Sequence, residues 1–184
     1  MTRAAHADAV RTLQAWSPHD AGQDELRTAF LAHLRDHPDA TSRSGPPAHL
    51  TVGALVLDPT GEHVLLTHHR KARAWFQFGG HIEAGDASLR AAAARELQEE
   101  SGVAGLVPSP EPCHLHRHAL PAAFGTCREH LDVRYLAVAP RTTRPVVSQE
   151  SLDVRWFAVE DLPGAAAEDL RGLIAAGRRA LGRP

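Results

Sequence analysis

Several features that define other protein classes are missing from this chain of 184 residues. Its two cysteines, Cys113 and Cys127, form no CxxC pair and no disulfide framework, which favours a reducing cytosol. No apolar run approaches the roughly 20 residues needed to cross a bilayer, and the N-terminus lacks the apolar stretch of a secretory signal. A net charge of −2 gives no electrostatic reason to expect nucleic acid or a membrane as partner. We therefore expect a cytoplasmic protein.

Asparagine is absent, and Lys71 is the single lysine beside 19 arginines. This bias indicates a G+C-rich coding genome and a bacterial source. Hydrophobic residues make up 43% of the chain, which is enough to form a core without stabilising disulfides or metal ions. The length fits one domain, or one domain with an extension.

Hydrophobic spacing divides the chain into a helical beginning and a strand-rich remainder. Helices are predicted over 4–16 and 23–36, where Pro38 stops the run, and a polar linker follows over 39–49. Alternating or aromatic segments then predict strands at 49–58, 62–69, 74–80, 111–120, 130–139 and 152–159. Further helices are predicted at 87–101 and 167–181. This order favours α/β layers around a mixed sheet, preceded by a helical extension.

Three carboxylates crowd the end of the predicted central helix, in "RELQEES". Glu96, Glu99 and Glu100 lie three and four residues apart, so they share one helical face and repel one another. Such an oxygen-rich patch suits Mg²⁺, which commonly shares its coordination shell with substrate phosphates. Arg95 lies one turn before Glu99 and can orient the carboxylates. The alternative is a solvated acidic helix face with no ligand.

The loop before this helix supports the metal interpretation. "FGGHIEAGD" places Gly79 and Gly80 at a strand end, where bare backbone can approach a ligand closely. Asp86 is a suitable N-cap for the helix, and Gly102 a suitable C-terminal cap.

Together, loop and helix resemble the signature of the Nudix hydrolase family: glycine, five residues, glutamate, seven residues, then Arg-Glu-aliphatic-any-Glu-Glu-any-Gly-aliphatic. Gly80 matches the first glycine, and the run from Arg95 to Val103 matches the second half in register. Asp86 stands in place of the first glutamate, and one extra residue separates it from Arg95. The resemblance spans roughly residues 49–181, which implies a Nudix-type α/β/α sandwich at 46–184 behind an extension and linker at 1–45.

The resemblance implies hydrolysis of a nucleoside diphosphate linked to a further group, with Mg²⁺ or Mn²⁺ as cofactor. Carried over, Glu96, Glu99 and Glu100 are the metal ligands, joined by the Gly79 carbonyl, and Arg95 orients the carboxylates. A carboxylate must also act as general base toward the attacking water. The candidates are Glu99, which we favour, then Glu150, and Glu129.

Other residues near the signature have two interpretations each. His81 either touches a substrate phosphate beside Gly80 or is merely exposed. The basic loop "HHRKAR" either grips a phosphate, with Arg70 the better candidate, or is a solvated turn. Strand alternation places Phe76 and Phe78 on one face and Trp75 on the other, where aromatics are more often core than nucleobase platforms.

Histidines also raise the question of zinc. His114, His116 and His118 share one face of a predicted strand, and His68, His69, His81 and His130 could join them. Because no cysteine or carboxylate stands at zinc-site spacing beside this strand, we favour a histidine-rich surface over a zinc site.

Two further functions remain open. Isopentenyl diphosphate isomerase has the same domain but protonates carbon with a cysteine and a glutamate, and neither Cys113 nor Cys127 has that context. A non-catalytic nucleotide-binding module is expected to have lost part of the carboxylate cluster, which here is complete. The identity of the nucleotide or other diphosphate substrate, the role of the N-terminal helices and the formation of a homodimer are not determined by the sequence.

Overall fold

The computed structural model describes residues 2–120, 126–149, 151–164, 166 and 168–183. Within them the helices are α1 (Thr2–Ala15), α2 (Ala21–Asp36), α3 (Leu89–Ser101) and α4 (Leu170–Ala180). The strands are β1 (Ala48–Leu57), β2 (His63–His69), β3 (Ala74–Phe76), β4 (Phe78–His81), β5 (Pro112–Ala119), β6 (Glu129–Val138) and β7 (Ser151–Ala158). The predicted order of helices and strands is confirmed. No helix in this part of the chain is long and apolar enough to span a membrane.

The strands form one mixed sheet with β1 at its centre. β1 pairs in parallel with β6 and antiparallel with β2 and β4. β5 pairs with β6 at one edge, while β3 and β7 both pair with β2. Because helices and neighbouring strands cover it on all sides, nearly every residue of β1 is buried, including the polar His49 and Thr51.

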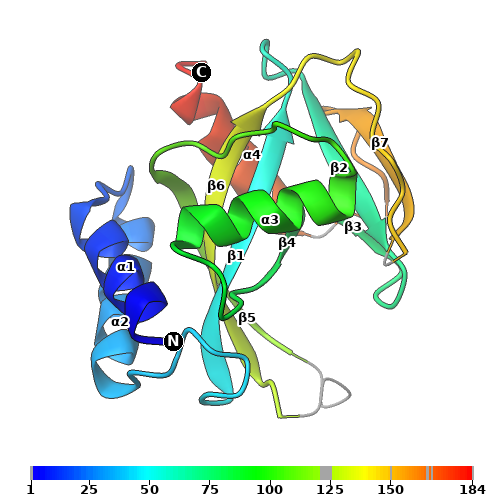
Figure 1. Ribbon diagram of the computed structural model, residues 1–184. Coiled ribbons are helices and arrows are strands. Elements are labelled where there is room, and N and C mark those ends of the chain that lie inside the picture. The colour runs from blue at the N-terminus through cyan, green and yellow to red at the C-terminus, as the bar shows by residue number, and fades with distance from the viewer. Residues whose placement is uncertain (1, 121–125, 150, 165, 167, 184) are drawn as a thin grey trace.

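Helices α3 and α4 pack on opposite faces of the sheet (Figure 1). Alternation along β1 directs Ala54 and Val56 toward Leu97 of α3, whereas Leu55 and Leu57 pack with residues of α4. The predicted α/β/α sandwich is therefore confirmed. It positions α3 across the sheet, with its acidic face beside the end of β4.

The N-terminal helices α1 and α2 share a core with the sheet. Phe30 and Leu34 are fully buried in one cluster with Leu50 and Leu115. The side chain of Gln23 pairs with the backbone of Leu115 at the β5 edge, donating at 3.0 Å and accepting at 2.6 Å. Asp8 accepts a hydrogen bond from the backbone N–H of Leu89, the first residue of α3. The extension thus covers a sheet edge and helps to cap α3.

Two local predictions are wrong. The N-cap of α3 is Ser88, whose side chain accepts from the Ala91 N–H, and Asp86 has another role described below. The predicted strand 74–80 is broken at Gln77, because β3 pairs with β2 whereas β4 pairs with β1. The predicted C-terminal cap is confirmed, since Gly102 has the left-handed conformation with φ of 65°.

Candidate active site

Arg95 lies at the centre of an ion-pair network on α3. Its Nη1 donates to the carboxylates of Glu96 and Glu99, each at 3.0 Å. Its Nε and Nη2 donate to the two oxygens of Asp86 at 3.1 and 3.0 Å, and Nη2 also donates to the His81 carbonyl at 2.8 Å. Burial alone would lower the pKa of Arg95, but Asp86 and Glu96 raise it above its ordinary value. The guanidinium therefore stays charged and fixes two of the three carboxylates.

Asp86 is the buried anchor of this network. Its side chain is 7% exposed, and it also accepts from the Glu83 N–H at 2.7 Å. This geometry accounts for the departure from the signature. Because Ser88 caps the helix, the additional residue lies in the loop. The shorter aspartate still accepts from both Nε and Nη2 of Arg95.

Gly79 and Gly80 allow β4 to pass close to α3 and β1. The Gly79 N–H donates to Glu100 at 2.8 Å. With φ of 152°, Gly79 has a backbone that L side chains rarely adopt, and a Cβ there would lie 2.3 Å from the Val52 carbonyl oxygen. A Cβ on Gly80 would lie 2.6 Å from an oxygen of Glu96. Both glycines are required for the carboxylates to approach the backbone.

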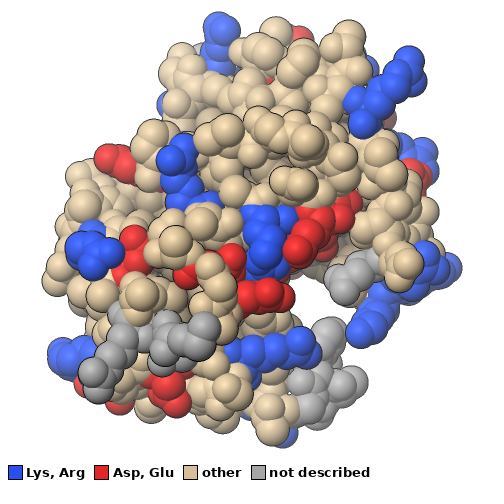
Figure 2. Space-filling model, in the orientation of Figure 1, with Lys and Arg blue, Asp and Glu red and all other residues tan. Residues whose placement is uncertain are grey.

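These groups face a cleft of about 590 Å³, which opens beside the acidic face of α3. Figure 2 shows acidic side chains gathered around a basic one over α3, next to a hollow in the surface. The described lining includes Glu96, Glu99, Glu100 and Arg95, and also Gly79, Gly80 and His81. The structure therefore brings the main predicted site residues together at one cavity.

The remaining predicted residues lie elsewhere. Arg70 donates to the backbone carbonyls of Gln149 and Ser151 and is absent from the described cleft lining. Glu129 pairs with Arg117 at 2.7 and 2.8 Å and is likewise absent from that lining. Glu150 lies outside the described residues.

Two cations that sequence reasoning did not single out line the cleft, Lys71 and Arg43. Lys71 lies next to Arg70 in the predicted basic loop, so composition could have suggested it, whereas nothing local distinguishes Arg43. Phe76 also lines the cleft, whereas Phe78 and Trp75 are buried in the core. Trp75 packs with residues of α4 and Phe78 with Leu97 of α3, so these two lie on opposite faces of the sheet, as predicted.

The histidines form two groups rather than one. His116 and His118 lie beside Asp132, whose carboxylate accepts from Arg134 at 2.8 Å and from Thr51. A guanidinium nitrogen of Arg134 also lies 3.1 Å from Nδ1 of His116. A fixed cation therefore already neutralises this first group.

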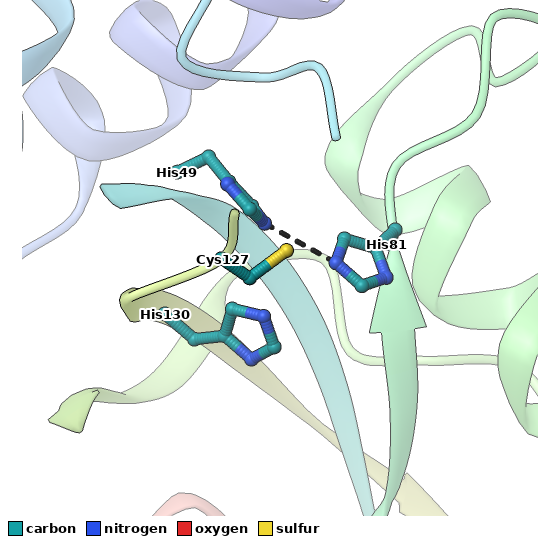
Figure 3. A group of neighbouring side chains, drawn as sticks. All are labelled: His49, His81, Cys127 and His130. Carbon is teal, nitrogen blue, oxygen red and sulfur yellow. Dashed lines mark hydrogen bonds between the residues drawn. The ribbon is translucent and has the colours of Figure 1, made fainter. Parts of the chain in front are cut away.

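The second group joins His49, His81 and His130 to Cys127 (Figure 3). Burial lowers the pKa of His81 to about 4, helped by His49 and Arg43, so this imidazole is neutral near pH 7. The expectation that no cysteine or carboxylate stands beside the strand 111–120 missed both groups, since Asp132 joins His116 and His118, and Cys127 joins His130. A signal was present in "TCREH", where two residues separate Cys127 from His130.

Comparison with known proteins identifies the family to which this fold belongs. The model of the NUDIX domain matches residues 47–176, and no curated protein matches. A MutT NUDIX hydrolase from Burkholderia pseudomallei is similar, with 23% identity over 70% of this chain and 97% of that one, and a TM-score of 0.56. An Ap4A hydrolase from C. elegans has 19% identity over 72% and 97%, with a TM-score of 0.58.

The NUDIX domain of NrtR from Shewanella oneidensis, solved with ADP ribose, is also similar. It has 25% identity over 72% of this chain and 87% of that one, with a TM-score of 0.57. The family model covers the sheet, α3 and most of α4, and the signature residues within it converge on one cleft. The chain therefore belongs to the NUDIX hydrolase family.

Proposed function

We propose that this protein is a Mg²⁺-dependent pyrophosphohydrolase that cleaves a nucleoside diphosphate linked to another group, with Mn²⁺ as an alternative metal. The observation that carries the proposal is the convergence of Glu96, Glu99 and Glu100 with Arg95 on one wall of the 590 Å³ cleft. Three carboxylates within about one helical turn are costly without a cation, and the single guanidinium of Arg95 offsets only part of their charge.

The donor set fits a hard divalent cation. Its members are the three glutamates and the backbone at Gly79, all oxygen donors, which Mg²⁺ prefers. Glu100 is held by the Gly79 N–H at 2.8 Å, and Glu96 lies against the Gly80 Cα, so two carboxylates are positioned before any metal binds. A bound Mg²⁺ would neutralise pyrophosphate charge and lower the pKa of a bound water.

The protein's own residues then have distinct tasks. Arg95 orients Glu96 and Glu99 through its 3.0 Å hydrogen bonds. Glu99, with a side chain 60% exposed at the cleft, is the preferred general base and takes the proton of the attacking water, with Glu150 second. Lys71 and Arg43 line the cleft where they can neutralise outer phosphate oxygens, and His81 and Gly80 border the same space.

The alternatives account for less of the geometry. An isomerase needs a cysteine and a glutamate facing one substrate carbon. Cys113 is buried in the core, and Cys127 lines the cleft but lies among three histidines. A binding module without catalysis has no need for all three glutamates and their orienting arginine. The cytoplasmic location, the homodimer and the boundary between 1–45 and 46–184 remain predictions from the sequence.

The test is product release from a panel of nucleoside-diphosphate-linked compounds, measured with Mg²⁺ and with EDTA. We expect Mg²⁺-dependent cleavage that falls about a hundredfold or more in Glu99→Gln, since a positioned general base contributes about 10²–10⁴. Gln98→Ala is the matched control, because Gln98 is exposed on the same helix and lies outside the described cleft lining. Ligand-dependent stabilisation without any turnover would contradict the proposal and favour a binding module.

A further inference from the structure

Four side chains with metal-binding atoms meet at the cleft, and three of them belong to its described lining. His49 lies near the start of β1, His81 ends β4, His130 lies on β6, and Cys127 precedes β6. The sheet itself brings them together, because His49 is the direct partner of His130 in the β1–β6 pairing. Figure 3 shows the sulfur of Cys127 directed toward the space between the three imidazole rings. We call these residues the His3Cys group.

The ligand atoms of the His3Cys group lie close enough together for small side-chain rotations to form a tetrahedral metal site. One ligand atom from each residue lies within 4.8 Å of all the others. Zinc bonds of about 2.0–2.1 Å to nitrogen and 2.3 Å to sulfur place tetrahedral ligand atoms about 3.3–3.6 Å apart. Nε2 of His49 and Nε2 of His81 are already 3.2 Å apart. Small side-chain rotations therefore suffice to close the remaining distances.

The hydrogen bonds of His49 prepare it as a ligand. Its Nδ1–H donates to the Pro46 carbonyl at 3.1 Å, which leaves Nε2 without a proton and directed toward the other three residues. Metal-binding histidines in proteins commonly have this arrangement, with the second ring nitrogen held by a backbone carbonyl. The bare Nε2 of His49 accepts a hydrogen bond from Nε2 of His81, so its lone pair faces the other members of the group.

His130 is an independent sign of a missing partner. Its Nε2 is buried, and no hydrogen-bond partner exists for it among the residues that the structure describes. A buried polar nitrogen without a partner costs stability unless it finds a hydrogen bond or a metal ion. The neighbouring group of His116, His118 and Asp132 differs, because Arg134 already supplies its positive charge.

From this geometry we propose that the His3Cys group binds one zinc ion, separate from the Mg²⁺ carboxylates. Three imidazole nitrogens and one thiolate are a donor set typical of zinc, whereas Mg²⁺ requires oxygen. All four positions come from protein, which is the pattern of a structural ion. The zinc fastens the segment at Cys127 to β1 and β4. Because the His81 carbonyl accepts from Arg95 at 2.8 Å, the ion also helps to hold the arginine that orients the carboxylates.

The test is direct metal binding by the full chain after chelator treatment, in excess Mg²⁺ that saturates the carboxylates. We expect one equivalent of Zn²⁺ to bind. One equivalent of Co²⁺ should produce the strong visible absorption of a tetrahedral ion and a near-ultraviolet thiolate charge-transfer band. Cys127→Ser should abolish the charge-transfer band, and His130→Ala should weaken Zn²⁺ binding about a hundredfold or more, since even the outer partners of metal ligands contribute about 10–100-fold.

Two controls separate this site from others. Cys113→Ala removes the other cysteine, which is buried in the core, and should leave the cobalt spectrum unchanged. Glu99→Gln alters the carboxylate cluster and should leave Zn²⁺ binding unchanged, so failure of the hydrolase proposal does not affect this result. In the unaltered protein, Zn²⁺ should slow alkylation of Cys127, which avoids any effect of substitution on folding. Absence of stoichiometric binding, or a thiolate charge-transfer band that persists in Cys127→Ser, would overturn the proposal.

Discussion

Replacing Asp86 with alanine tests whether a single buried carboxylate holds the signature arginine in place. Asp86 accepts two hydrogen bonds from Arg95, at 3.0 and 3.1 Å, and one from the Glu83 N–H at 2.7 Å. Its side chain is 7% exposed and that of Arg95 is 21% exposed, so water replaces the lost partner poorly. The substitution therefore leaves a largely buried guanidinium without its most buried counter-ion.

The expected cost follows from these contacts. A hydrogen bond to a charged group contributes about 1.5–3 kcal/mol, and breaking a fully buried ion pair costs about 3–5 kcal/mol. Arg95 is partly exposed and retains Glu96, Glu99 and the His81 carbonyl, so the lower part of this range applies. We expect Asp86→Ala to lower the free energy of unfolding by about 2–4 kcal/mol. In a protein of this size that lowers Tm by roughly 5–15 °C.

The assay is urea and thermal unfolding near pH 7, followed by circular dichroism. Asp36→Ala is a matched control, because Asp36 makes the same two-bond contact with Arg35 at an exposed position. An exposed ion pair of this kind contributes little, so the control should be nearly as stable as the unaltered protein. If Asp86→Ala is no less stable than Asp36→Ala, burial of the pair does not hold Arg95 in place, and the argument is refuted.

Three further predictions concern the cleft, the extension and pH. Gly80→Ala should weaken Mg²⁺ activation about tenfold or more, since its Cβ lies 2.6 Å from Glu96 Oε1 and loss of metal-site support costs about 10–100-fold. Gly85→Ala should leave Mg²⁺ activation unchanged, because a Cβ at Gly85 would meet open space. Equal effects of the two substitutions would contradict the steric explanation. Phe30→Ala should destabilise the whole protein by about 3–5 kcal/mol in one unfolding transition, because Phe30 is fully buried in the shared core. A separate early transition would show that the extension folds independently. Burial, and to a smaller extent the charge of Arg134, lowers the pKa of His114 from 6.5 to about 4 in the folded protein. As pH falls, His114 is therefore protonated in the unfolded chain before it is protonated in the folded one. Stability should therefore fall as pH drops from 6.5 to 4, and His114→Leu should make this slope shallower in urea titrations.

Local patterns in the sequence determined the helices and strands and the acidic face of α3. Three signals depend only on residues within one helical turn or one strand: apolar residues at helical spacing, strand alternation and the cap at Gly102. They can therefore be recognised in the sequence without tertiary structure. The same holds for Glu96, Glu99 and Glu100, because helical geometry alone places them on one face. These patterns predicted α/β layers around a mixed sheet, whereas the α/β/α sandwich and the carboxylates beside Gly79 followed from the resemblance to the Nudix signature.

Only the tertiary structure decided which distant residues share a site. His49 meets His130 because β1 and β6 pair in parallel in one register, and a shift by one residue would direct the two side chains to opposite faces. Arg70 does not line the cleft, because its side chain donates to the backbone at the start of β7. Asp86 is an ion-pair partner and not the N-cap, because Ser88 caps α3. Each outcome depends on contacts between strands and loops far apart in the chain, which the spacing of residues does not encode.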